Sequence, residues 1–491
     1  MNSNVVVVGA GFGGLSTAIL LARLGLRVTL VEGAAQPGGC LRSYSRQGVD
    51  CPVGVHYFGA AAPGEVLGDF IDLLGIRQEL KLRRLGQHGV IDRYLFDDGE
   101  VFDLPDTAEK LATALRVRFA DTPAAVDFVM DVCRAAMASL RTGTSGPAAR
   151  STLPITRTAA DVLAEKALPP RLVDILALQG FWVGVNLSGC PASFLMLATA
   201  SLLLSAWELG CTGANFADCL VDRARESGVN LIVGDPVAAI AVSDRRARGV
   251  RLQSGSEIAA DTVVAGVHPK TVTAMIAPDA LPTAYRDGIA GLEETEGTLC
   301  VVALVDDKRH PVPGHNLFRV RGNPRESVQG VYAQLRPCEI PGYNRLTVLM
   351  ESDYASWAAW HGTQSGRRGP DYRAEKLRRA QQALAAVADV LGPVQEPQII
   401  DTWTPLTMRD WVGAPRGNTY GARHTIRDGL EYLALSRPPL EGLFLVGQSA
   451  LAPGLLGISM GVLRVATAIA GRPAVRDLMA ASRQAARGTD P

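Results

Sequence analysis

The sequence predicts an α/β fold in which a nucleotide-binding domain is built from separate stretches of the chain, with an α+β domain interleaved between them. Three observations predict it. The chain opens with a β-α-β pattern around a glycine-rich turn, and it closes with a strand, a second glycine-rich turn and a helix. Its 491 residues are enough for two or three domains. Its 51 glycines indicate many tight turns or close contacts between backbone and ligand.

The first two strands and the helix between them follow from the residue pattern. Val5–Val8 is an uninterrupted apolar run, typical of a parallel strand buried on both faces. Leu15–Leu24 repeats apolar residues at helical spacing, and Arg27–Val31 is a second β-branched run. The turn after the first strand reads Gly9-Ala10-Gly11-Phe12-Gly13-Gly14. It matches G-x-G-x-x-G, a Rossmann-type motif whose glycines allow a tight turn, a close approach to pyrophosphate and close packing of helix on strand.

An acidic residue completes this dinucleotide fingerprint. Glu32 ends the second strand, at the distance behind Gly14 where a carboxylate accepts hydrogen bonds from an adenosine ribose. The N–H groups that open the helix would face the pyrophosphate. The simpler alternative is a glycine-rich turn with an incidental glutamate. The register of strand, glycines, helix, strand and acid favours the dinucleotide site.

The stretch that follows favours FAD over NAD. A second glycine pair, Gly38 and Gly39, lies close behind the acid, and such a turn can pass under a longer cofactor. Arg42 and Ser43 are then available to phosphate or ribityl oxygens. A simple NAD domain needs no such addition. No second G-x-G-x-x-G is visible for a dedicated NAD(P)H domain.

The rest of the chain predicts the interleaved domain and the closing elements. Arg93–Phe96 and Glu100–Leu104 flank an Asp-Asp-Gly turn, which predicts a hairpin. Residues 106–210 are largely helical in pattern, and 298–352 alternates β-type runs with turns. Further strands and helices are expected at Leu231–Val242, Gly249–Gln253, Thr262–Ala265, Ala374–Leu391, Leu443–Val446 and Gly461–Ala470.

These elements divide the chain into three regions and a tail. The FAD-binding domain is expected to take 1–80, 211–270 and 425–475. The sheet of the substrate domain takes 81–105 and 271–424, and 106–210 forms a mainly helical substrate or lid region. Residues 476–491 are expected to be a C-terminal tail that frays from Ala480.

Composition excludes several other classes of protein. Lys+Arg and Asp+Glu are both 49, so the chain lacks the excess of cations that a nucleic-acid binder needs. The eight cysteines form no C-x-x-C pair and no zinc spacing with histidine, so no metal site is expected. Scattered thiols and the absence of a signal-peptide pattern predict a cytoplasmic protein. The oligomeric state is left open.

One apolar stretch bears on membranes. Pro191–Trp207 carries no charge, but it contains several hydroxyl residues and lies at the short edge of a spanning length. A buried helix or tunnel wall is therefore favoured over a true span. Peripheral contact with a membrane surface is the remaining alternative.

The motifs behind Glu32 resemble those of a known family. Gly38–Gly59 contains Gly-Gly-Cys followed by Gly-Val-His-Tyr-Phe-Gly. This run resembles the flavin-binding N-terminus of the phytoene desaturase superfamily, closest to the branch of all-trans-retinol saturase and carotenoid isomerase. Bacterial polyene tetramate macrolactam cyclases are similar. Aspartate is usual in that family where Cys51 stands here.

The resemblance implies FAD and a set of residues around it. Leu443–Ser449 with Pro453–Gly461 resembles the family's closing motif, which carries the ribityl chain and the isoalloxazine ring. Gln448 stands where many related flavoproteins have an acid, and it can still bond a ribityl hydroxyl. The backbone around Val237 would meet the adenine. The implied FAD contacts are Gly9, Gly11, Phe12, Gly13, Gly14, Glu32, Gly38, Gly39, Arg42, Val237, Gly447, Gln448, Gly457 and Ile458.

His56 and Tyr57 lie in the motif that passes near the cofactor, so they are the candidate proton donors to a substrate carbon. The alternative is that His56 only bonds backbone in a tight turn. Apolar side chains of the helical region suit either the walls of an elongated substrate site or an ordinary core, namely Phe181, Trp182, Phe194, Met196 and Trp207.

The block before the last strand supplies further candidates. Trp403, Tyr420 and His424 suit either the substrate cavity or simple packing. Arg409 and Arg416 suit an acidic substrate head, although solvated loop arginines are the more ordinary interpretation.

A flavin carries out the redox step itself, and the protein positions the substrate. The resemblance therefore implies an FAD-dependent oxidoreductase that acts on a hydrophobic conjugated polyene. Reduction or reductive cyclisation in bacterial secondary metabolism is expected, with NADPH as the candidate electron donor. The first alternative is a carotenoid or retinoid desaturase, saturase or isomerase. The second is a flavin amine oxidase, which would need an aromatic cage at the ring, and the third is a non-catalytic FAD-binding escort protein.

Overall fold

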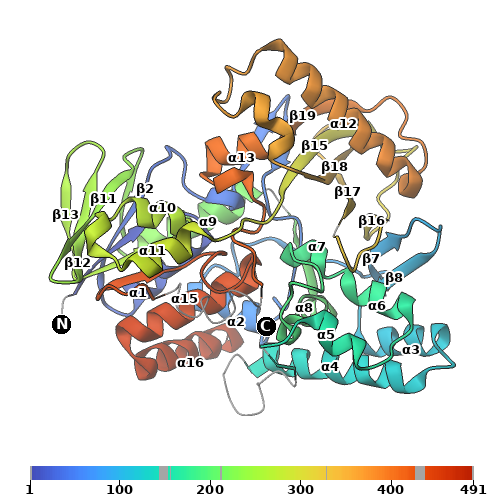
Figure 1. The fold of residues 1–491 in the computed structure, drawn as a ribbon, viewed down its shortest axis with the longest axis horizontal. Helices are drawn as coiled ribbons and strands as arrows, with labels where there is room; N and C mark the ends of the chain where they lie inside the picture. Colours follow the sequence, from blue (N-terminus) through green and yellow to red (C-terminus); the bar gives the residue numbers. More distant parts are fainter. Residues whose placement is uncertain are drawn as a thin grey trace.

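The computed structural model describes residues 3–142, 153–154, 156–210, 213–327, 329–425 and 437–488. Two large sheets organise them, and helices cover the sheets (Figure 1). One sheet is parallel and draws its strands from both ends and the middle of the chain. The other is mainly antiparallel, and a group of helices lies beside it. The predicted α/β fold class is confirmed.

The parallel sheet has five strands in the order β10-β2-β1-β14-β20. Every neighbouring pair runs parallel. Alternate valines of the first strand enter different cores, since Val5 and Val7 pack on one face and Val6 and Val8 on the other. Burial on both faces is what the apolar run predicted. The strands are β1 (Asn4–Val8), β2 (Arg27–Glu32), β10 (Asn230–Val233), β14 (Thr262–Ala265) and β20 (Leu443–Leu445).

Helices cover one face of this sheet, and a small sheet with two short helices covers the other. The first face carries α1 (Phe12–Arg23), α2 (Val66–Leu74), α9 (Gly213–Glu226), α15 (Gly454–Ala470) and α16 (Arg472–Gly488). The second carries β11 (Val237–Ser243), β12 (Arg246–Leu252), β13 (Glu257–Ala259), α10 (Pro269–Ala274) and α11 (Thr283–Ala290).

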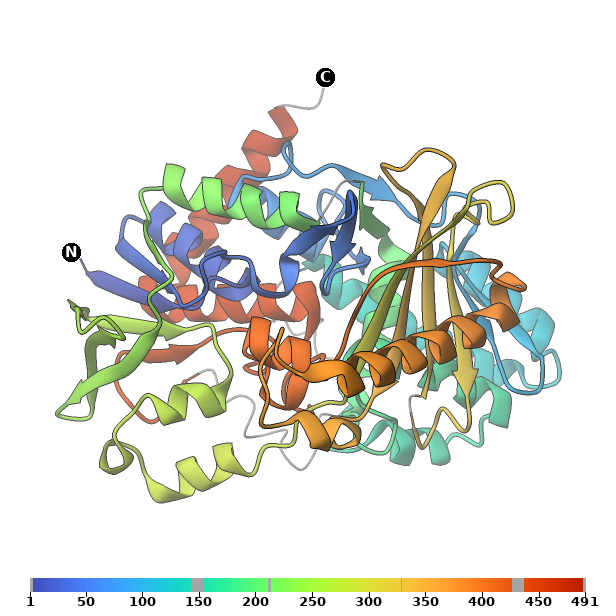
Figure 2. The ribbon, with the colours of Figure 1, turned by 90° about the horizontal axis from the view of Figure 1, so that it is seen from above.

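The second large sheet has seven strands in the order β19-β15-β18-β17-β16-β7-β8. The pair β16–β7 is parallel and the other pairs are antiparallel. Helix α12 (Gly369–Leu391) runs across one face (Figure 2). The strands are β7 (Val90–Leu95), β8 (Val101–Pro105), β15 (Gly297–Asp306), β16 (Asn316–Arg321), β17 (Gln329–Pro337), β18 (Tyr343–Ser352) and β19 (Gln398–Trp403).

The register of this sheet places aromatic side chains in one row on the face opposite α12. Tyr94 pairs with Phe318, which pairs with Tyr332, which pairs with Leu349. The row continues through Cys300 to Trp403 on the edge strand. Because residues directly opposite in a ladder share a face, this row forms one continuous apolar surface.

The helical region packs against that face with its own core. Its helices are α3 (Ala108–Arg118), α4 (Pro123–Thr142), α5 (Ala159–Ala164), α6 (Pro170–Ala177), α7 (Gly180–Val183) and α8 (Leu197–Leu204). A strand that no sequence pattern indicated, β9 (Ala206–Leu209), follows α8 and pairs with β5 (Phe58–Gly59) and β6 (Leu82–Arg84). Short elements elsewhere are β3 (Ser43–Arg46), β4 (Val49–Pro52) and α13 (Pro405–Val412).

The apolar stretch Pro191–Trp207 is not one helix. A 3₁₀ turn at Ala192–Phe194 precedes α8, and Met196 between them has a left-handed φ of 65°. The stretch therefore changes direction inside the protein. Over the described ranges, no helix is both long and apolar enough to cross a membrane.

Three other expectations need correction. The run Leu231–Val242 is divided between β10 and β11, which lie in different sheets, because the chain turns at Gly234 with φ 77°. The closing helix α15 begins at Gly454, well before the expected start at Gly461. The C-terminal segment does not fray from Ala480, since α16 runs to Gly488 and Arg483 donates to Asp69 of α2 at 2.8 Å.

Candidate functional site

A cavity of about 1300 Å³ is lined by residues of both large sheets and of the helical region. It exceeds the roughly 300–1,000 Å³ of most small-molecule sites, so a dinucleotide and a substrate can share it. Most predicted FAD contacts line it: Gly9, Gly11, Phe12, Gly13, Glu32, Gly39, Arg42, Val237, Gly447, Gln448, Gly457 and Ile458. Gly14 and Gly38 do not.

In the first glycine-rich turn, Gly11 is open to the cavity, whereas Gly14 packs tightly on the backbone of Gly9. A Cβ on Gly11, the N-cap of α1, would meet no protein atom within 4 Å, so the backbone there is open to the cavity. A Cβ on Gly14 would overlap the carbonyl oxygen of Gly9. Gly14 therefore acts in packing, as its place in the motif predicts. The first N–H groups of α1 lack intrahelical partners and suit an anion beside Gly11.

Glu32 holds the turn as well as facing the cavity. One carboxylate oxygen accepts from the backbone N–H of Ala10 at 2.7 Å, and the other accepts from Ala34 at 2.8 Å. A carboxylate has about four acceptor positions, so ribose hydroxyls can still bond it. The predicted ribose contact remains open, and a structural role that the sequence did not reveal is added to it.

Arg42 fixes the loop that carries the second glycine pair. Its Nε donates to Gly39 O at 3.1 Å, and its Nη1 and Nη2 donate to the carbonyls of Gln36 at 3.2 Å and Trp411 at 2.6 Å. Most of its donors are thus engaged by backbone, although the side chain lines the cavity. Gly38 lies behind this loop and donates its N–H to Ala10 O at 2.7 Å.

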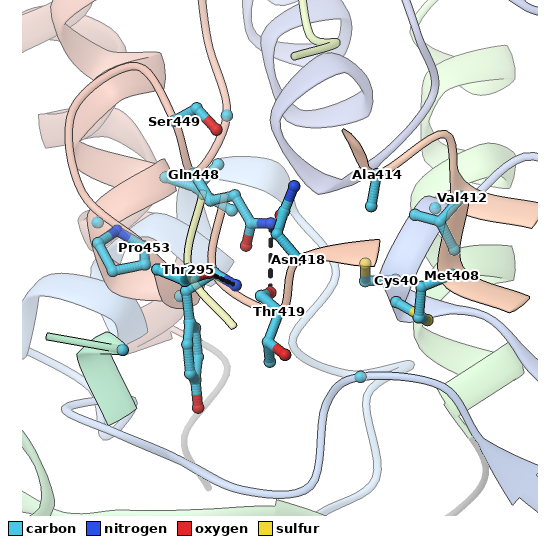
Figure 3. Close-up of a pocket in the computed structure, with 18 of the residues that line it drawn as sticks. Cys40, Thr295, Met408, Val412, Ala414, Asn418, Thr419, Gln448, Ser449 and Pro453 are labelled. Carbon is cyan, nitrogen blue, oxygen red and sulfur yellow. Dashed lines mark hydrogen bonds between the residues drawn. The ribbon is translucent and has the colours of Figure 1, made fainter. Parts of the chain in front are cut away.

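The closing motif contacts the first one directly, and both line the cavity. A Cβ on Gly13 would lie 3.2 Å from both Gly447 N and the Ile458 side chain, so the two turns are in close contact. Figure 3 shows Gln448 and Thr419 joined by a hydrogen bond, with Nε2 donating to the carbonyl at 3.3 Å. Cys40 and Met408 line the opposite side in that view.

Two helix N-termini therefore open onto one cavity, those of α1 at Gly11 and α15 at Pro453. Each end carries a partial positive charge. Phosphate groups suit the first end, and a ring that gains negative charge on reduction suits the second. The open backbone at Gly11 and the acceptor at Glu32 complete a set of residues that fits FAD.

The two predicted proton donors differ in what they offer the cavity. Both line it. Within the described part of the chain, neither ring nitrogen of His56 has a hydrogen-bond partner or reaches the cavity surface, and burial lowers the pKa of this histidine to about 4. The Tyr57 hydroxyl accepts from Trp182 Nε1 at 2.5 Å and contacts Asp92 Oδ2 at 3.0 Å. Burial raises its pKa well above 10.

Tyr57 is therefore the better placed of the two, and it belongs to a polar group that the motifs did not include. Asp92 is fully buried, and burial raises its pKa to about 6. Asn316 donates to it at 2.9 Å. One signal was present in the sequence, because Asp92 and Tyr94 alternate along a strand whose face is otherwise apolar.

The predicted substrate walls are partly corrected. Phe181, Trp182 and Phe194 line the cavity, but Met196 and Trp207 do not. Apart from Trp403, the sequence did not indicate the aromatic row of the seven-stranded sheet, from which Phe318, Tyr332, Leu349 and Trp403 line the cavity. Long-range strand register creates this row, so no local pattern could have shown it.

Of the candidate residues in the block before the last strand, some line the cavity and others do not. Trp403 and Tyr420 line the cavity, whereas His424 does not. Neither Arg409 nor Arg416 lines it. Arg409 instead donates to the carbonyls of His361 and Thr363, both at 2.6 Å, and so ties two loops together. The expectation of an acidic substrate head at these arginines is not supported.

The sequence of residues 12–456 matches the family described as flavin containing amine oxidoreductase. The chain belongs to this family. Like its members, it is a flavin-dependent oxidoreductase, and FAD is the cofactor that its glycine-rich turns fit. The predicted membership of a phytoene desaturase-like superfamily of FAD oxidoreductases is confirmed, because named relatives include retinol reductases and carotenoid desaturases.

Two of these relatives match almost the whole chain. The all-trans-retinol 13,14-reductase of Danio rerio is 25% identical, with 96% of this chain and 86% of the relative covered. The hydroxyneurosporene desaturase of Rubrivivax gelatinosus is 28% identical, with 97% and 93% covered. An oxidoreductase structure from Methanosarcina mazei shares the fold, with a TM-score of 0.66, 15% identity and coverage of 94% and 99%. The two named relatives act in opposite redox directions.

Proposed function

We propose that this flavin-containing amine oxidoreductase family member adds hydrogen to a C=C bond of a hydrophobic conjugated polyene of the retinoid or carotenoid kind. One observation carries the proposal. The cavity runs from the nucleotide-binding turns at Gly11 and Gly13 to the aromatic row Phe318, Tyr332 and Trp403. A flat, elongated apolar molecule can lie along such a row, and each methylene group that it buries contributes roughly 0.8 kcal/mol.

The named relatives support this substrate class more than the cyclisation of a macrolactam precursor. The reducing direction rests on the acid at Tyr57, because reduction of a conjugated chain needs a proton after hydride arrival. We further propose NADPH as the electron donor. It would meet the flavin within the shared cavity, because the sequence shows no second G-x-G-x-x-G.

An amine oxidase is the second candidate, and the family description favours it. Such an enzyme would hold its substrate between two aromatic rings. The parallel pair Tyr57 and Tyr332 has ring centroids 6.0 Å apart with an angle of 6°. A group in van der Waals contact with both rings would need roughly 7–8 Å between them. This pair therefore does not form a cage.

An anaerobic turnover experiment tests the proposal. Holoenzyme is mixed with NADPH and, in separate reactions, all-trans-retinol, hydroxyneurosporene and a primary diamine, and flavin bleaching and product mass are followed. A polyene product heavier by two hydrogens supports the proposal. A product lighter by two hydrogens, formed only with an oxidant, makes the protein a desaturase. Oxidation of the diamine alone makes it an amine oxidase, and no redox turnover favours an escort protein.

A matched pair of variants tests the cavity itself. Ala198 of α8 lines the cavity, whereas Ala164 of α5 is exposed and does not. Ala198→Phe should narrow the cavity and lower kcat/KM for the polyene by at least about tenfold, because the added ring would take space that the substrate needs, and overpacking of this kind costs about 1–3 kcal/mol. Ala164→Phe should leave kcat/KM for the polyene unchanged. Equal effects of the two substitutions would argue against substrate binding along this wall.

A further inference from the structure

Beside the aromatic row, the same face of the seven-stranded sheet carries a row of buried polar side chains. Asp92 of β7 and Asn316 of β16 are register partners, and both are fully buried. Gln334 of β17 lies next to them and donates through Nε2 to Asn316 Oδ1 at 3.2 Å. Burial of such groups costs free energy unless each one finds a partner. The hydrogen bonds of this row therefore define its chemistry.

The orientation of Asn316 is fixed by its neighbours. Its Oδ1 accepts from Arg336 Nη2 at 2.9 Å, from Gln334 at 3.2 Å and from Tyr332 Oη at 3.3 Å. Because these groups are donors, the amide nitrogen must face the other way. It donates to Asp92 Oδ1 at 2.9 Å. One oxygen of the carboxyl is thus committed to an N–H donor.

The other carboxyl oxygen meets two hydroxyls. Asp92 Oδ2 lies 3.0 Å from Tyr57 Oη and 3.2 Å from Tyr94 Oη. A proton on Asp92 therefore belongs on Oδ2, since Oδ1 faces an N–H. Of the two tyrosines, Tyr57 lines the large cavity and Tyr94 does not.

We propose that Asp92 and Tyr57 form a proton-transfer pair, in which Tyr57 gives a proton to the substrate carbon and Asp92 restores it through Oδ2. This rests on the proposed function. Bound reduced flavin would supply a hydride to one carbon of the conjugated chain, which would leave the electron pair of the double bond on another carbon. That carbon takes the proton of the Tyr57 O–H bond, and the phenolic oxygen takes the proton of Asp92. Asp92 is left as a carboxylate.

The nicotinamide hydride donor of the proposed function would supply the two electrons that the flavin passes to the substrate. After the product leaves, water in the cavity reaches Tyr57 and returns a proton to Asp92 along the same pair. Asp92 does not touch the substrate and is a positioning and proton-holding residue, whereas Tyr57 makes the contact. The Trp182 indole N–H holds the Tyr57 oxygen in both states, because it donates at 2.5 Å.

The protonation state of Asp92 decides which way the Tyr57 proton points. When Asp92 is protonated, its O–H donates to Tyr57, and the Tyr57 proton is free to face the cavity. When Asp92 is a carboxylate, Tyr57 donates to it and withholds that proton. Reduction should therefore slow as pH rises through about 6, the pKa to which burial raises Asp92. If the same pair served desaturation, the rate would instead increase as pH rises through about 6.

Among the described residues, a small set of groups faces Asp92. Tyr57, Tyr94 and Asn316 bond it, and their hydrogen bonds favour the carboxylate. Arg336 is the nearby cation and acts in the same direction. Its charge is offset by the buried ion pair that it makes with Glu208. Burial exceeds all of these effects, so the carboxyl retains its proton to an unusually high pH.

Single-turnover kinetics of the reduced holoenzyme test the pair. Wild-type enzyme should reduce the polyene up to tenfold more slowly for each pH unit above about 6. Asp92→Asn keeps the size of the side chain but cannot exchange the proton, so its rate should be about 100-fold lower at acid pH and independent of pH. Flavin reduction by NADPH should be unchanged, because that step needs no proton from Tyr57. Asp103→Asn is the matched control, since Asp103 lies on the neighbouring β8 and pairs with Arg93.

Infrared difference spectra of the oxidised holoenzyme supply a readout that does not depend on turnover. The carbonyl band of a protonated carboxyl should titrate near pH 6 in wild type and be absent in Asp92→Asn. In Tyr57→Phe the same band should titrate at higher pH, because the carboxylate loses one donor.

The outcomes separate the pair from the substrate class. If Asp92→Asn reduces the polyene at the wild-type rate and with the wild-type pH dependence, or if no carboxyl band is lost in that variant, Asp92 and Tyr57 are not a proton-transfer pair, even when the polyene is reduced. If no polyene is turned over but the band titrates and responds to Tyr57→Phe as expected, the proposed function fails and the coupled pair stands.

Discussion

Gly11→Ala should separate binding of FAD from folding. A Cβ at this position would meet no protein atom within 4 Å, and the backbone there, with φ −76° and ψ −176°, suits alanine. Alanine caps a helix less well than glycine, but it also reduces the entropy of the unfolded chain, and each effect is worth about 0.5–1 kcal/mol. The free energy of unfolding of the apoprotein should therefore change by less than about 1 kcal/mol.

The effect on FAD should be much larger. The added methyl group enters the space where the backbone would contact pyrophosphate, so at least one charge-assisted hydrogen bond is lost. Such a bond contributes about 1.5–3 kcal/mol, which corresponds to an increase of Kd by about 10- to 150-fold. Quenching of flavin fluorescence during titration of the apoprotein measures Kd, and urea unfolding measures stability.

Two glycines provide the controls. Gly288→Ala changes an exposed helix position that has open space and does not line the cavity, so Kd should stay the same. Gly14→Ala should prevent correct folding, because its Cβ would overlap Gly9 O. If Gly11→Ala bound FAD as tightly as wild type, or lost as much stability as Gly14→Ala, the backbone at Gly11 would not be the open contact for pyrophosphate.

Three further outcomes are expected. Glu32→Gln should weaken FAD binding and also lower the apoprotein's free energy of unfolding by about 1.5–3 kcal/mol, because the carboxylate bonds two backbone N–H groups; an effect on FAD alone would contradict this. Arg336→Leu should lower the free energy of unfolding, measured in urea, by about 3 kcal/mol, because it removes one partner of the buried Glu208. Arg83 also pairs with Glu208 but is 46% exposed, so Arg83→Ala should lower the free energy of unfolding by less than about 1 kcal/mol. The free energy of unfolding of the wild-type protein should decrease as pH falls from about 6.5 towards 4, because His56 has a pKa of about 4 in the folded protein and is protonated more readily when unfolded. His56→Asn should make this decrease smaller, by up to roughly 3 kcal/mol. An equal pH dependence in both proteins would contradict the prediction.

Local sequence patterns were sufficient to predict the nucleotide-binding half. Each of its signals is local: an apolar run, a glycine-rich turn, a helical repeat and an acid, all between Val5 and Glu32. Local geometry enforces part of this pattern, because Gly9 has a φ of 90° and a Cβ on Gly14 would overlap Gly9 O. Even there, the backbone bonds of Glu32 and Arg42 became visible only once the loops were placed.

The substrate half depends on contacts between residues that are distant in the chain. Tyr94, Phe318 and Tyr332 are far apart in the sequence, and they form one row only because β7, β16 and β17 pair in a particular register. Asp92 meets Tyr57 because the turn before β5 packs on the same face of this sheet, where the Tyr57 ring lies against Tyr332. A strand pattern shows which residues share a face but not which strands are neighbours, and pairing between positions as distant in the chain as Asp92 and Asn316 depends on the packing of the whole domain. The cofactor could therefore be predicted from motifs, whereas the walls of the cavity and its proton-transfer pair required the fold.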